Sequence, residues 1–170
     1  MGVPKTRPVD IPFIASGDAD FHMLEAGGEM LKLAVVNMGN PHAVLPVTCI
    51  EQAVVQLLGP LLESHSRFPA KVNVSFMQVL ACDVIKLRVY ERGTGETLAC
   101  GSGACAAVVA DRRAGWLDAK VTVLLTGGAL HIEWAGDNTP VLMEGPASTV
   151  YEGQWVYSDR YNTNGSGPIL

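Results

Sequence analysis

The chain has 170 residues, a formal net charge of −5 and 48% hydrophobic residues. That length is enough for one domain or two small ones with a packed core, and the composition excludes a disordered chain. The acidic balance without a basic stripe argues against nucleic acid, and no apolar run reaches the roughly 18 residues of a membrane span. Without a signal-peptide core at the first residues, and with four cysteines in no framework spacing, we expect a cytoplasmic protein.

The predicted elements are mostly strands. Three prolines within residues 1–20 indicate an extended arm, and an apolar stripe over 50–62 predicts a helix that Gly59-Pro60 should kink or split. Gly127-Gly128 predicts the two-residue turn of a hairpin. A polar, glycine-containing stretch over 158–170 predicts a flexible tail. The expected strands, in chain order, are 31–36, 43–47, 72–80, 84–90, 121–125, 130–134, 141–144 and 149–156.

Residues 91–105 join a charged pair, a glycine loop and a cysteine to an alanine-rich stretch. The loop 93–97 should be irregular, because two glycines and two threonines break either period. From residue 104 onward the composition predicts a helix that ends before Gly115. Cys100 therefore lies near the start of a helix, where unpaired N–H groups carry partial positive charge. We expect these groups to lower the pKa of Cys100 and to hold a carboxylate or phosphate.

Other interpretations of the cysteines are simpler. A single cysteine before a helix is most often a small buried side chain, although the flanking Gly101 and Gly103 favour close approach of a ligand. Cys105 should face the core. A phosphate-binding loop is not expected, because no Lys-Ser or Lys-Thr follows the glycines. No metal site is expected either, since the cysteines and histidines lack ligand spacing.

Three further groups of polar residues have two interpretations each. Asn40 and His42 flank a proline in a turn, and on that tetrapeptide alone a turn asparagine and an edge histidine are favoured. Asn73 lies in an apolar strand and must be hydrogen-bonded, either as a structural clamp or as a ligand contact. Glu91 and Arg92 can recognise an amino-acid head group or form a surface ion pair of little energetic value.

A resemblance to a known family rests on residues 36–42, 58–65, 67–69, residue 73 with 76–79, and 88–106. Together these segments resemble diaminopimelate epimerase, in register from about residue 1 to residue 157. The resemblance implies a cofactor-independent enzyme, without pyridoxal phosphate, that interconverts L,L- and meso-2,6-diaminopimelate for lysine and peptidoglycan synthesis. It implies an α+β fold with a mixed, largely antiparallel sheet curled around a central helix. In that family two such halves each supply one cysteine, on opposite faces of the substrate α-carbon.

The resemblance also assigns roles to individual residues. Cys100 is implied to be one of two acid–base thiols, supported by His42 and Glu91. Tyr151 is implied to lie at the interface of a homodimer. The implied substrate-binding residues are Asn40, Asn73, Glu91, Arg92, Gly101 and Ser102, with no metal.

The chain is shorter than the family pattern, which has a preceding half that bears the other cysteine. We therefore expect residues 1–145 to form the C-terminal domain, and residues 146–157 to complete the sheet of the N-terminal half. With one thiol, the chain is expected to be inactive alone. Two alternatives are a related isomerase acting on proline derivatives or a phenazine precursor, and a non-catalytic domain that self-associates through its unpaired strand.

Overall fold

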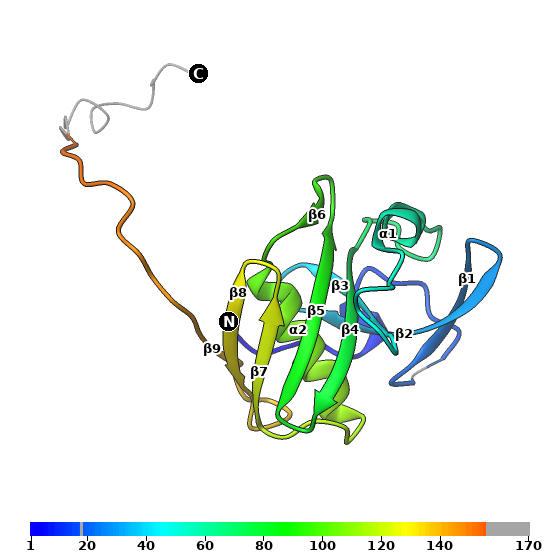
Figure 1. Cartoon of the computed structure of the whole chain (residues 1–170). Coiled ribbons are helices and arrows are strands. Elements are labelled where there is room, and N and C mark those ends of the chain that lie inside the picture. Colours follow the sequence, from blue (N-terminus) through cyan, green and yellow to red (C-terminus); the bar gives the residue numbers. More distant parts are fainter. Residues whose placement is uncertain (18, 156–170) are drawn as a thin grey trace, which may run out of the picture.

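The computed structural model describes residues 1–17 and 19–155, so the predicted tail at 158–170 lies outside the described part (Figure 1). Within it are two α-helices, α1 (Val55–Glu63) and α2 (Gly101–Arg113), and a 3₁₀ turn at Pro8–Asp10. The strands are β1 (His22–Ala26), β2 (Glu29–Asn37), β3 (Pro41–Pro46), β4 (Asn73–Ala81), β5 (Val84–Glu91), β6 (Gly95–Thr97), β7 (Lys120–Leu125), β8 (Gly128–Glu133) and β9 (Leu142–Glu144).

The strands form one mixed sheet in the order β1-β2-β3-β4-β5-β7-β8-β9, with β6 paired to β5. The pairs β3–β4 and β5–β7 are parallel, and every other pair is antiparallel. Helix α2 contacts strands that lie far apart in this order, namely β2, β3, β4 and β8. The sheet therefore curls around α2, as Figure 1 shows, and the predicted fold class is confirmed.

Helix α2 is buried on all sides. Its residues from 103 to 111 are all buried, and four of them are alanines. A helix that is apolar all round belongs inside a structure, and small side chains let a curved sheet close around it. Cys105 is fully buried there, as predicted.

The alternation of side chains along the strands divides the core in two. Met77, Leu87 and Val89 pack with α2 in one cluster, whereas Val74 and Phe76 pack with α1 and the N-terminal arm in the other. Successive residues of a strand point to opposite faces, so residue parity tells which side chains face α2. This parity places the polar residues of the site.

Helix α1 differs from the prediction. It begins at Val55 and runs unbroken through Pro60 to Glu63. Proline removes one helical hydrogen bond, but packing of this short helix against β5 outweighs that loss. Gly59 allows the close approach, because a Cβ there would lie 2.5 Å from the ring of Tyr90.

Several strand predictions are corrected. The 93–97 loop was expected to be irregular, but Gly95–Thr97 forms β6, because its ladder to β5 outweighs weak strand propensity. Strand β1 was not predicted, since its sequence alternates only briefly. The β7–β8 hairpin is present, but its turn is Thr126-Gly127, because Gly128 pairs with Leu125.

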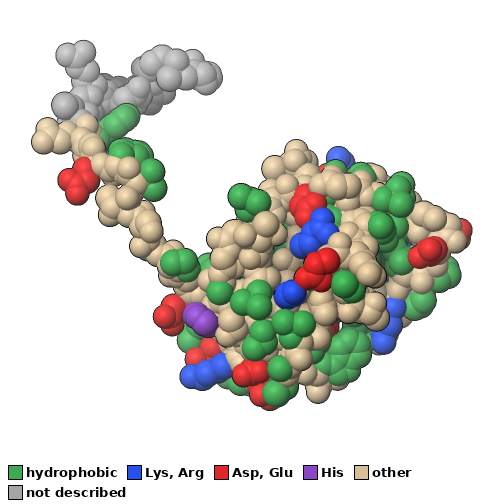
Figure 2. Space-filling model, in the orientation of Figure 1, with side chains coloured by type: hydrophobic (Ala, Val, Ile, Leu, Met, Phe, Trp, Pro, Cys, Tyr) green, Lys and Arg blue, Asp and Glu red, His purple; other side chains and the backbone are tan. Residues whose placement is uncertain are grey.

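The predicted strand at 149–156 is wrong for the residues that are described. Residues 145–155 have no helix or strand and project from the body of the molecule (Figure 2). Val150, Tyr151 and Trp155 are 90%, 85% and 90% exposed. A strand is defined by the hydrogen bonds of its ladder, and in the described part of the chain no strand pairs with this segment.

Candidate functional site at the start of helix α2

Three neighbouring strands begin or end at the same end of the sheet. β3 and β4 run parallel and begin at this end, and β5 runs antiparallel to β4 and stops there. Parity places His42, Asn73 and Glu91 on the α2 side of the sheet. The start of α2 lies at the same end of the sheet, because the Nδ2 of Asn40 donates to the Oγ of Ser102 at 3.5 Å. The predicted site residues therefore come together, although 62 positions separate Asn40 from Ser102.

Cys100 is the N-cap of α2. Its backbone is extended (φ −140°, ψ 105°), and the helix begins at Gly101, three residues before the predicted start. The thiol is buried, with 6% of the residue exposed, and its Sγ lies 3.6 Å from the Oγ of Ser102. Cys100 thus has the burial of a core cysteine together with polar contacts that a core cysteine does not need.

The expected lowering of the Cys100 pKa is wrong. Burial raises the pKa of the thiol above its ordinary value, more than hydrogen bonds from the Ser102 hydroxyl and the Gly103 N–H lower it. The carboxylate of Glu91 raises it further. Removal from water disfavours the charged form, so the helix terminus does not decide the outcome. The thiol is protonated at neutral pH in this chain.

The two glycines that follow Cys100 have different surroundings. A Cβ on Gly103 would lie 3.3 Å from the Cys100 Sγ, 3.3 Å from the Ser75 Oγ and 3.2 Å from a methyl of Val89. The thiol therefore occupies space that only glycine leaves. A Cβ on Gly101 would lie 3.0 Å from the sulfur of Met143, a flexible side chain.

His42 and Asn40 connect to the helix start. His42 is fully buried in the interior strand β3, so the edge histidine favoured from the tetrapeptide is wrong. Its Nε2 lies 3.0 Å from the Oδ1 of Asn40, an atom that can only accept, so Nε2 carries the proton. The Nδ1 is a buried acceptor without a hydrogen-bond partner among the described residues. Burial and, secondarily, the Arg92 cation lower the pKa of His42 to about 4, so the ring is neutral.

Asn73 is a clamp. Its Nδ2 donates to the carbonyl of Pro41 at 3.0 Å, and its Oδ1 accepts from the backbone N–H of Arg92 at 3.0 Å. The residue is 4% exposed. The amide therefore ties the start of β3 to the turn after β5, and its substrate-binding role stays a prediction.

Glu91 and Arg92 are held separately. The hydroxyl of Thr97 donates to the Oε1 of Glu91 at 2.6 Å and so holds the carboxylate. Arg92 donates through Nη1 to the carbonyl of Ala70 at 2.8 Å and is otherwise exposed. Neither residue has an ion pair within residues 1–17 and 19–155, so the surface ion pair is wrong.

Sequence reasoning missed Ser75, Thr97 and Glu63. Ser75 is fully buried beside Gly103, and its hydroxyl has no hydrogen-bond partner in the described part of the chain. Thr97 holds Glu91, and Glu63 accepts from the N–H of Gly93 at 2.8 Å. The one available signal was the acid Glu63 directly after the predicted apolar stripe over 50–62, because an acid that becomes buried requires a partner.

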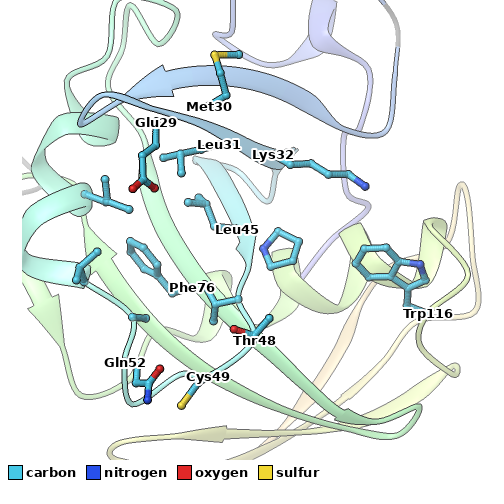
Figure 3. Close-up of a pocket in the computed structure, with 15 residues that line it drawn as sticks. Glu29, Met30, Leu31, Lys32, Leu45, Thr48, Cys49, Gln52, Phe76 and Trp116 are labelled. Atoms are coloured by element: carbon cyan, nitrogen blue, oxygen red, sulfur yellow. The ribbon is translucent and has the colours of Figure 1, made fainter.

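A separate hollow is lined by β2, the end of β3 and the connection that follows β3 (Figure 3). It has a volume of about 460 Å³, and Leu45, Phe76, Cys49, Lys32 and Trp116 are among its lining residues. It shares no residue with the site at Cys100. All four cysteines are free, and no three His, Cys, Asp or Glu side chains in the described ranges are placed to hold a metal ion. None of the described helices is both long enough and apolar enough to cross a membrane.

The fold and site define a class: an α+β domain that presents a thiol, a carboxylate and bare helix N–H groups at one sheet edge. The sequence model of the family described as diaminopimelate epimerase matches residues 34–150, more than half of the chain. The chain belongs to the diaminopimelate epimerase family.

Curated relatives with that name match nearly the whole chain. The protein of Laribacter hongkongensis is 58% identical over 156 residues, which cover 91% of this chain and 56% of the relative. That of Alkalilimnicola ehrlichii is 58% identical over 154 residues, covering 91% and 55%. That of Coxiella burnetii is 54% identical over 156 residues, covering 92% and 56%. The chain therefore spans about half the length of the curated relatives it matches.

Two solved structures are similar at a lower level. A phenazine biosynthesis protein of the PhzF family from Bacillus anthracis aligns with a TM-score of 0.46 and 21% identity, over 72% of this chain and 38% of its own. A probable proline racemase from Agrobacterium radiobacter K84 aligns with a TM-score of 0.49 and 18% identity, over 72% and 44%. Similarity at this level does not bear on the substrate.

Proposed function

We propose that the chain is the C-terminal half of a diaminopimelate epimerase and supplies one of its two acid–base thiols. The observation that carries the proposal is the Cys100 thiol at the start of α2, beside the backbone N–H groups of Gly101 and Ser102. These residues lie within the segment that matches the family. The proposed substrate is 2,6-diaminopimelate, without a cofactor. The relatives' printed name supports this substrate over proline derivatives or a phenazine precursor.

The proposed mechanism uses one proton donor and one proton acceptor on opposite faces of the α-carbon. A base removes the α-proton, and the electron pair left on carbon delocalises into the adjacent carboxylate. The N–H groups of Gly101 and Ser102 hold that carboxylate where negative charge accumulates. Cys100, whose burial keeps the thiol protonated, delivers its proton to the carbon from the other face. In the reverse direction Cys100 is the base.

The other residues of the site recognise and hold the substrate in this proposal. Arg92, with one N–H group bound to Ala70, has others available for a substrate carboxylate. Glu91 binds an ammonium group of the substrate, and its carboxylate raises the pKa of Cys100. The neutral His42 offers its Nδ1 as an acceptor. Asn40 and Asn73 are proposed to bind the substrate as well, with Asn73 also bonded to the Arg92 backbone and Asn40 to Ser102.

A second thiol is needed for inversion, because one thiol returns the proton to the face from which it came. This chain has one cysteine in a glycine-flanked motif, so the proposed partner is an N-terminal half that carries the other. Residues 146–157 would complete the sheet of that half. Of these, residues 156 and 157 lie outside the described part, and the rest are exposed and unpaired.

Tyr151 is proposed to contribute to a homodimer of the intact enzyme, which we place in the cytoplasm. Its 85% exposure on a projecting segment leaves its ring available for burial against a partner. Sedimentation of the joined enzyme should show a dimer that Tyr151→Ala weakens, with Trp155→Ala as a matched aromatic control. A monomeric parent, or an equal effect of both variants, would contradict the assignment.

The direct test of the proposed function measures deuterium incorporation at the diaminopimelate α-carbon in D₂O. The isolated chain should bind the substrate weakly and show no epimerisation. The chain joined to an N-terminal half from a relative should epimerise and incorporate solvent deuterium. Full turnover by the isolated chain, or turnover of a proline derivative in place of diaminopimelate, would refute the proposal.

A further inference from the structure

The segment 58–65, which the function leaves unused, supports the hairpin that carries the site. Helix α1 contacts both β5 and β6, and Figure 1 shows it beside their shared end. Near the start of α1, Gln56 donates to Glu96 of β6 at 2.8 Å. In the middle, Gly59 lets the helix approach Tyr90 of β5. At its end, Glu63 reaches the loop between the two strands.

The Glu63 carboxylate is largely shielded from water, since its side chain is only 10% exposed. Its Oε1 accepts from the backbone N–H of Gly93 at 2.8 Å and from the Nζ of Lys71 at 3.4 Å. A buried carboxylate needs such partners, because losing them leaves an uncompensated charge. The Gly93 contact spans 30 residues, so it fixes the loop from outside the hairpin.

The loop held in this way consists of residues 92–94. Glu91 pairs with Gly95 across it, and the N–H of Thr94 donates to the carbonyl of Glu91 at 3.0 Å. Gly93 has a φ of +77°, a conformation that favours glycine. Two successive backbone N–H groups are therefore anchored from outside: that of Arg92 by Asn73 and that of Gly93 by Glu63.

The connection between α1 and β4 completes the support. Arg92 donates to the carbonyl of Ala70, and the next residue, Lys71, has a φ of +56° and contacts Glu63. The end of α1, this connection and the loop thus form one network around Arg92. The direction of the guanidinium is set by groups that do not themselves reach the thiol.

We infer that Glu63 is a positioning residue for Arg92, whose guanidinium it presents to a substrate carboxylate by fixing the 92–94 loop. The loop contacts carry the structural part of this inference, and the effect on substrate rests on the proposed function. The oxygen that accepts from Gly93 matters more than the negative charge, because the acceptor sets the loop geometry. Glutamine at position 63 should therefore still hold the 92–94 loop, and alanine should not.

The test compares Glu63→Ala with Glu63→Gln, and uses Glu51→Ala as a control that removes a surface acid paired with Lys86 at 2.6 Å. In the isolated full chain, amide hydrogen exchange of the 92–94 loop should speed up about tenfold in Glu63→Ala, and about twofold or less in the other two. In the joined enzyme, Glu63→Ala should raise KM for diaminopimelate about tenfold and change kcat by less than about twofold.

Three outcomes would overturn the inference. Unchanged loop exchange in Glu63→Ala would show that the contact does not hold the loop. Faster exchange with an unchanged KM would show that the loop does not present Arg92. Equal damage in Glu63→Gln and Glu63→Ala would show that the charge, and not the acceptor, is required. An inactive parent enzyme would instead refute the proposed function, and the exchange measurement would still decide whether Glu63 fixes the loop.

Discussion

The two ends of helix α2 each bury a titratable side chain, in opposite surroundings. At the first end Cys100 lies beside the Ser102 hydroxyl and the bare N–H groups of the helix. Near the other end Asp111 is fully buried, and neither carboxylate oxygen has a hydrogen-bond partner among the described residues. Burial raises the pKa of both. The Ser102 hydroxyl and the Gly103 N–H can stabilise the charged thiol by hydrogen bonds, whereas the Lys32 cation offsets the burial of the Asp111 carboxyl only in part. This difference suits Cys100, and not Asp111, for proton transfer.

The largest predicted effect on the free energy of unfolding concerns the buried carboxyl of Asp111. Burial raises the pKa of Asp111 from 3.8 to about 7, and the Lys32 cation lowers it by a smaller amount. The neutral carboxyl therefore stabilises the fold below pH 3.8, and this contribution is lost as the pH rises to about 7. Asp111→Asn should be more stable than the parent at pH 8, by up to about 4 kcal/mol, and nearly equal near pH 4.

Urea unfolding at several pH values measures that difference. Asp137→Asn, at a side chain that is 72% exposed, is the control and should show no comparable trend. A variant at Asp111 that is less stable than the parent at pH 8 would show that the carboxylate has a partner, and the contrast between the two helix ends would fail.

A smaller effect is expected at Gly103. The Cβ of Gly103→Ala would crowd the Cys100 sulfur and the Ser75 hydroxyl at 3.3 Å each. The gain in helix propensity offsets part of that cost, so a net loss of roughly 1 kcal/mol is expected, with faster alkylation of the displaced thiol. Gly101→Ala is the matched control, because the Met143 side chain can move away. Equal effects at both glycines would contradict the assigned packing, as judged by unfolding and by mass spectrometry of alkylated peptides.

The smallest effect isolates one hydrogen bond. The Ser102 hydroxyl lowers the pKa of Cys100, so Ser102→Ala should raise that pKa further. The rate of Cys100 alkylation as a function of pH reports the shift. A lower pKa in Ser102→Ala would mean that the hydroxyl does not stabilise the thiolate.

The comparison between sequence and structure separates local from distant causes. Local pattern predicted the α2 helix, the β4 and β5 strands and the glycine-flanked Cys100. It could not predict that β3 is an interior strand, which buries His42, nor that the Asn73 amide is used by Pro41 and Arg92. Those facts depend on which strands become neighbours.

Two further errors have the same origin. Pro60 was expected to disturb a helix that packing on β5 keeps intact, and burial reversed the expected shift of the Cys100 pKa. The residues 149–155 have the pattern of a strand, but a pattern supplies only one side of a ladder. The resemblance to the family supplied the site residues together, and the roles it assigns to them stay predictions.

The central claim is that Cys100 transfers the proton at the substrate α-carbon. The most direct measurement is deuterium incorporation into diaminopimelate by the joined enzyme carrying Cys100→Ser, with Cys105→Ser as the control at a buried cysteine that faces the core. Cys100→Ser should lower epimerisation at least about a thousandfold, and Cys105→Ser should leave it within about tenfold of the parent. Epimerisation by Cys100→Ser within about tenfold of the parent would contradict this claim.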